Sequence, residues 1–160
     1  METGNPDEDR ARLAARAAVH VLAGDAASAH DEIEKARGLL ETRLHERPED
    51  EFNVMQLSWV NLALKRNAEA LRLAQLAGEL VSVQKDTLTG AHVLALVAEI
   101  QARAGEPAEA VKTLRRSLSI PAGNWISLQQ LKIDPVWDPI RNDPGFQQLL
   151  AGKEQIGPNK

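Results

Sequence analysis

The sequence predicts an all-α fold, and three observations support this class. Alanine, which has the best intrinsic helix propensity, occurs 24 times among the 160 residues. Aromatic residues make up only 3% of the chain and tyrosine is absent, a composition that favours helices packed closely together. Apolar residues recur at intervals of three and four almost throughout, which is the spacing of one helix face and not of a strand.

The first two helices are expected on either side of Ala23–Asp25. Their apolar stripes are Leu13, Ala17 and Val21 in the first helix, and Ala29, Ile33, Ala36 and Leu40 in the second. The glycine of Ala23–Asp25 is expected to end the first helix, and Asp25 is expected to cap the second. The segment therefore predicts a helix hairpin.

Two further hairpins are expected. Their apolar stripes are Phe52, Met55, Trp59 and Leu62, then Ala70, Ala74, Ala77 and Val81, then Leu94, Val97 and Ala98, then Ala110, Val111, Leu114 and Leu118. The breaks fall near Lys65 and Gly105, and Pro107 suits the first turn of a helix because its missing N–H is not needed there. The sequence thus predicts hairpins at about residues 7–46, 49–84 and 87–119.

The three hairpins are evenly spaced, which is the mark of an internal repeat. The turn positions are Gly24, Lys65 and Gly105, and the small residue early in each second helix is Ala29, Ala70 and Ala110. Both series advance by 41 and then by 40 residues. The sequence therefore predicts a repeating unit of about forty residues.

The segments GDAASAHDEIEKA and GEPAEAVKTLRRS resemble the turn and second helix of tetratricopeptide repeats. Each has a glycine, an alanine five residues on, then a large apolar residue (Ile33, Leu114) and a small one (Ala36, Ser117). RNAEALRLAQLA is a further copy in which Lys65 replaces the glycine. The resemblance implies a right-handed α-solenoid of three such hairpins, forming a single domain over residues 6–151.

The resemblance also implies a function, which is to serve as a protein–protein interaction scaffold. In this family the first helices of successive hairpins line a concave groove that holds a peptide or a partner domain. The positions implied here are Phe52, Met55, Trp59 and Leu62 from the second hairpin, and His92, Glu99 and Arg103 from the third. An apolar centre with a polar flank suits a peptide, whereas in the alternative interpretation Phe52 and Trp59 simply pack between helices.

The segment LKIDPVWDPIRNDPGFQQLL is expected to cap the last hairpin, within a closing segment of about residues 125–151, with flexible ends at 1–5 and 152–160. Aspartate before proline suits a helix start, so Asp134, Asp138 and Asp143 are expected to begin short helical turns. The alternative interpretation makes these three carboxylates catalytic or ligand-binding beside Trp137, which requires them to cluster around a cleft.

The closing segment, with the PAGNW turn before it, is similar to the end of tetratricopeptide regions in bacterial signalling proteins. Those proteins include eukaryotic-like serine/threonine kinases, adenylate cyclases and winged-helix regulators. This resemblance implies an alternative function, in which the chain is a C-terminal regulatory or sensory portion that self-associates as a homodimer.

Composition and motifs exclude several other classes. A net charge of -4 and a pI of about 5.6 argue against nucleic acid as a partner. The absence of cysteine excludes disulfides and thiol chemistry, and no nucleotide-binding or nucleophile motif is present. No stretch is apolar over about 18 residues, so this segment is not expected to insert in a membrane. We expect a cytoplasmic protein that is not an enzyme and has no catalytic residues and no cofactor.

The histidines give little indication of a metal. His20, His30, His45 and His92 include no pair four residues apart on a helix. His30 and Glu34 could face the same way on one helix, but two ligands are too few for a convincing site. We therefore expect no metal.

Overall fold

The computed structural model describes residues 6–84, 86–120 and 126–152, whose regular elements are all helices with no strand, which confirms the all-α class. The expected Pro121–Trp125 turn and the expected flexible ends, apart from Gly152, lie outside the described residues. The chain divides into two compact units, Met1–Ala77 and Gly78–Lys160, each of which is described by itself. A single domain over residues 6–151 stays a prediction.

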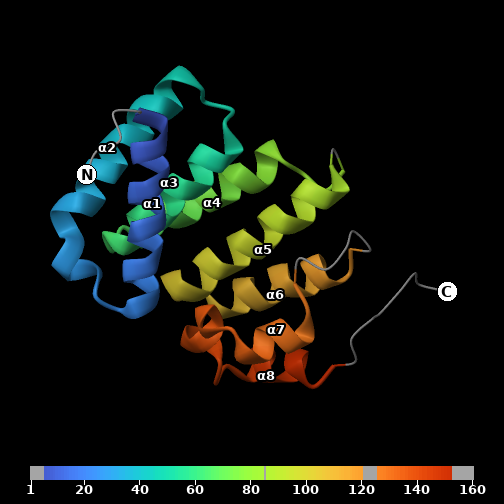
Figure 1. Cartoon of the computed structure of the whole chain (residues 1–160). Coiled ribbons are helices and arrows are strands. Elements are labelled where there is room, and N and C mark those ends of the chain that lie inside the picture. The colour runs from blue at the N-terminus through green and yellow to red at the C-terminus, as the bar shows by residue number, and fades with distance from the viewer. Residues whose placement is uncertain (1–5, 85, 121–125, 153–160) are drawn as a thin grey trace. The chain divides into compact units, whose positions relative to one another are not determined.

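The first unit is built from three whole helices, a 3-10 turn and most of a fourth helix (Figure 1). They are α1 (Pro6–Ala23), the 3-10 turn η1 (Ala26–Ala29), α2 (His30–Glu46), α3 (Glu51–Ala63) and α4 (Asn67–Leu80), the last of which contains the unit boundary. Helices α1, α2 and α3 all pack against one another. The most deeply buried side chains include Ile33, Leu40, Val54, Val60 and Leu73.

The second unit contains one long hairpin and the closing segment. Its elements are α5 (Thr87–Ala104), α6 (Pro107–Leu118), α7 (Leu128–Ile133), the 3-10 helix η2 (Pro135–Ile140) and α8 (Pro144–Leu150). Helix α5 packs along α6, η2 packs on α5, and α8 packs on α6 and α7 (Figure 1). The core of this unit includes Ile100, Leu114, Leu131, Trp137 and Phe146.

The three helix turns share one backbone conformation. The turn residues Gly24, Lys65 and Gly105 have φ values of 74°, 60° and 92°, all in the left-handed region. Each turn is closed by the same bond, from Asp25 N to His20 O (3.1 Å), from Arg66 N to Asn61 O (2.9 Å) and from Glu106 N to Gln101 O (2.9 Å). This is the six-to-one bond of the Schellman motif. The repeat expected from spacing is therefore present in the backbone at its three turns.

The prediction that Asp25 caps the second helix is wrong. Its Oδ1 lies 2.9 Å from Nδ1 of His20 at the end of α1, and its side chain makes no cap bond. The backbone of Asp25 (φ -115°, ψ 20°) also lies outside the extended region that a capping residue adopts. The chain instead makes the turn η1 before α2 begins at His30. Pro107 does occupy the first turn of α6, as predicted.

The closing segment contains a buried aromatic pair. Trp137 and Phe146 are 2% and 0% exposed, and their ring centroids lie 6.2 Å apart at an interplanar angle of 29°. Asp134 caps η2 by accepting from Val136 N (2.9 Å). Asp143 caps α8 by accepting from the N–H groups of Gly145 and Phe146. The predicted cap is confirmed for these two aspartates.

The same prediction is wrong for Asp138. This residue and Pro139 lie inside η2, so no new helical turn begins there. Both Nε and Nη2 of Arg141 donate to Asp138 Oδ1, at 2.8 and 2.7 Å. The same guanidinium also donates to the carbonyls of Lys132 (2.7 Å) and Asp134 (2.8 Å), which holds it beside Asp138. The carboxylate therefore pairs with a cation and does not reach free backbone N–H groups.

Candidate interaction surface

Helix α3 carries the four residues that sequence reasoning assigned to the second hairpin of the groove. Asp50 starts the helix by accepting from Asn53 N at 2.9 Å. Phe52, in the first turn, is 67% exposed, and Trp59, seven residues later and so on the same side, is half-buried. Met55 and Leu62 are only 5% and 4% exposed. Phe52 and Trp59 are therefore the two members of this set with exposed aromatic surface.

Buried polar contacts fix the orientation of α3 within the first unit. Asn53 Nδ2 donates to the carbonyl of Leu40 on α2 (3.1 Å), and Ser58 Oγ donates to the carbonyl of Ala70 on α4 (2.7 Å). Both bonds join buried groups, so loss of either bond would leave a buried polar atom without a partner. They determine which side of α3 presents Phe52.

Helix α5 carries the other three predicted groove residues, His92, Glu99 and Arg103. Asp86 starts this helix by accepting from the N–H groups of Leu88 and Thr89, both at 3.0 Å. The three groove residues are seven and four positions apart, which places them along one side of the helix, and all are partly buried. Burial lowers the pKa of His92, which favours its neutral form.

The two halves of the predicted set belong to different units. The α3 residues lie in the first unit and the α5 residues in the second. A single groove that includes all seven side chains therefore stays a prediction. An open depression is lined by Arg47, Pro48, Glu49 and Asp50, the last of which lies two residues before Phe52.

Glu99 has an electrostatic property that sequence reasoning missed. Its pKa is raised from the ordinary 4.5 to about 7, mainly because burial disfavours the charged form and further because of the negative charge of Asp134. The positive charge of Arg103 offsets part of this effect. The only sequence signal was the position of Glu99 between apolar residues of α5, since Asp134 is distant in the chain.

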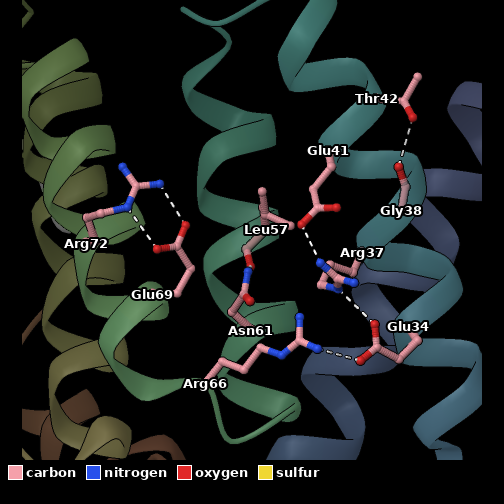
Figure 2. Close-up of polar contacts among 10 residues, drawn as sticks. All are labelled: Glu34, Arg37, Gly38, Glu41, Thr42, Leu57, Asn61, Arg66, Glu69 and Arg72. Atoms are coloured by element: carbon pink, nitrogen blue, oxygen red, sulfur yellow. Dashed lines mark hydrogen bonds and ion pairs between the residues drawn. The ribbon is translucent and has the colours of Figure 1, made fainter.

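A second group of charges lies on the first unit, where Glu34 of α2 accepts from two arginines (Figure 2). Arg37 Nε lies 2.8 Å from Glu34 Oε2, and Arg66 Nη2, from the turn after α3, lies 2.9 Å from Oε1. Arg37 also donates to Glu41 (2.6 Å). The hydrogen bond from Arg37 is the largest cause of the lowered pKa of Glu34. This network ties α2 to the α3–α4 turn at the surface.

The described residues contain no group of three or more histidines, aspartates or glutamates placed to hold a metal ion. Within the same residues, no helix combines the length and apolarity needed to cross a membrane. No protein-family model matches the chain, and neither curated proteins nor solved structures gave a match.

Proposed function

We propose that the chain is a right-handed solenoid of tetratricopeptide type, which binds a peptide or partner domain through the exposed side of its first helices. The shared turn at Gly24, Lys65 and Gly105 supports the repeat. The packing of α3 against both α1 and α2 supports stacking, because each new hairpin of a solenoid rests on the pair before it.

The exposure of Phe52 carries the proposal. A phenylalanine buries a large apolar area when it is covered, yet Phe52 is 67% exposed while α3 as a whole is deeply packed. Trp59 adds a second aromatic surface two turns along the same side. Aromatic side chains of this kind dominate the binding energy of interfaces. We assign Phe52 and Trp59 as the anchors, with Met55 and Leu62 supporting them from beneath.

The test is a selection of binding peptides from a random library displayed on phage, using the whole chain as the target. Peptides that bind the wild type are synthesised and their dissociation constants measured against Phe52→Ala and Trp59→Ala. We expect each substitution to weaken binding about 10- to 30-fold, as removal of an interface anchor does. The circular dichroism spectrum of Phe52→Ala should remain helical, because Phe52 contributes little buried surface in the free protein. The spectrum of Trp59→Ala, whose side chain is half-buried, checks that this variant keeps its fold.

Ile133→Ala is the matched control. Ile133 is 79% exposed and apolar but lies outside the predicted groove, so peptide affinity should not change. The proposal fails if the selected peptides bind Phe52→Ala and Trp59→Ala as tightly as they bind the wild type. It also fails if Ile133→Ala weakens binding as much as the two groove substitutions do, since the apolar surface used would then be a different one.

A further inference from the structure

The contact between η2 and α5 brings together a small set of charged groups. Glu99 and Arg103 are one turn apart on α5, and Arg103 Nη2 donates to the carbonyl of Pro135 in η2 at 3.1 Å. The residue before Pro135 is Asp134, whose carboxylate caps η2, and Asp138 lies one turn further along. The contact therefore gathers the carboxyl groups of Glu99, Asp134 and Asp138 with two cations, Arg103 on α5 and Arg141, which pairs with Asp138.

The charged groups that act on Glu99 come from α5 and η2. They are Asp134, which opposes its ionisation, and Arg103, which favours it, while Asp138 acts on Arg103. Helix α6, which also packs on α5 in this unit, contributes the buried small and apolar residues Ala110, Val111 and Leu114. An ionised Glu99 would thus lie in a poorly solvated place next to another negative charge.

We propose that Glu99 is a proton-operated latch, which lets η2 dock firmly on α5 when its carboxyl group is neutral and loosens η2 when the group is ionised. Helix η2, which would loosen, carries Trp137 and Ile140, both 2% exposed in the closed arrangement. The latch therefore controls how firmly the end of the last hairpin is covered. All the contacts that form the latch lie within the second unit.

The direction of the pH effect follows from the raised pKa of Glu99. Below its ordinary value of 4.5 the carboxyl group is neutral in both the docked and the released state, and the latch contributes fully to stability. As the pH rises from 4.5 through about 7, only the released state gains the favourable ionisation. Docking of η2 is therefore strongest in mild acid and weakest above neutral pH.

Amide hydrogen exchange of the whole chain, followed by NMR, measures this equilibrium locally. The reporters are the N–H groups of Trp137 and Arg141, which donate to the carbonyls of Asp134 and Asp138. After correction for the intrinsic exchange rate at each pH, we expect their protection to fall between about pH 5 and pH 8. The fall should be about tenfold for each unit by which release lowers the pKa of Glu99.

Three variants make the test specific. Glu99→Gln should retain high protection at every pH, because the amide stays neutral. Asp134→Asn, whose side chain still caps a helix, should make the fall in protection smaller and end it at a lower pH, because loss of the negative charge lowers the pKa of docked Glu99. The exposed control Glu106→Gln should behave as the wild type does.

Two results would overturn the latch. One is protection at Trp137 and Arg141 that does not vary with pH in the wild type. The other is a pH dependence of protection in Glu99→Gln that equals that of the wild type. Amides within α6 provide the internal reference, since a global change in stability would move them together with the reporters.

Discussion

The hydroxyl group of Ser58 on α3 donates a hydrogen bond of 2.7 Å to the carbonyl of Ala70 on α4, and both residues are 0% exposed. Ser58 occupies the position that alanine fills in the equivalent helices, at Ala17 and Ala98. The helix pair is therefore held by a polar contact at a point where small side chains allow close approach.

Replacement of this hydroxyl group gives the first prediction. Ser58→Ala should lower the free energy of unfolding by about 1 kcal/mol, the usual net value of one buried hydrogen bond. Urea denaturation measures the change. Ser119→Ala is the matched control, because its hydroxyl makes a similar bond to the carbonyl of Arg116 (2.8 Å) at an exposed site. If Ser58→Ala and Ser119→Ala lost the same unfolding free energy, burial would not be what makes the Ser58 bond stabilising.

The second prediction concerns the turn between α3 and α4, where Lys65 holds a left-handed φ of 60°. Lys65→Gly should raise the free energy of unfolding by about 1 kcal/mol, because glycine adopts this conformation without the steric cost that a Cβ carries. Gly105→Ala should have the opposite effect of similar size, since a Cβ there would meet no atom within 4 Å and only the backbone conformation is unfavourable. Thermal unfolding of both variants measures these two changes. Melting temperatures that shift in the same direction in both variants would contradict the prediction.

The third prediction separates the three Asp-Pro aspartates. Asp134→Ala and Asp143→Ala should each cost about 1 kcal/mol of unfolding free energy, the usual loss for a helix cap. Asp138→Ala should cost less than about 0.5 kcal/mol, because its partner Arg141 forms an exposed ion pair with it. Chemical denaturation at two salt concentrations checks this, since only the Asp138 effect should weaken in salt. An equally large loss in all three variants would contradict the assignment.

Much of the fold could be predicted from the sequence because apolar periodicity and turn spacing are local signals. The stripe of Ile33, Ala36 and Leu40 is buried as expected. The turn at Lys65 was located from spacing alone, although no glycine marks it. Side-chain partners were harder to predict, because an aspartate can bond either to backbone N–H groups or to a nearby cationic or imidazole side chain, and only the folded geometry decides between them. Asp25 bonds to His20, and Asp138 bonds to Arg141.

The candidate site could be predicted less completely. Helical spacing placed Phe52, Met55 and Trp59 on one helix, but spacing does not reveal depth, and Met55 proved to be buried while Phe52 is exposed. The raised pKa of Glu99 depends on burial and on Asp134, a residue brought near only by folding. Neither effect has a signature in the order of residues along the chain.

The left-handed turn at Lys65 has a practical consequence. These 160 residues contain no cysteine, so Lys65→Cys would give this chain a single thiol. The side chain at this position is exposed and already accommodated by the local backbone. A fluorophore or spin label attached there would report on the end of α3 without disturbing the packed interior, and it would leave Phe52 and Trp59 chemically untouched.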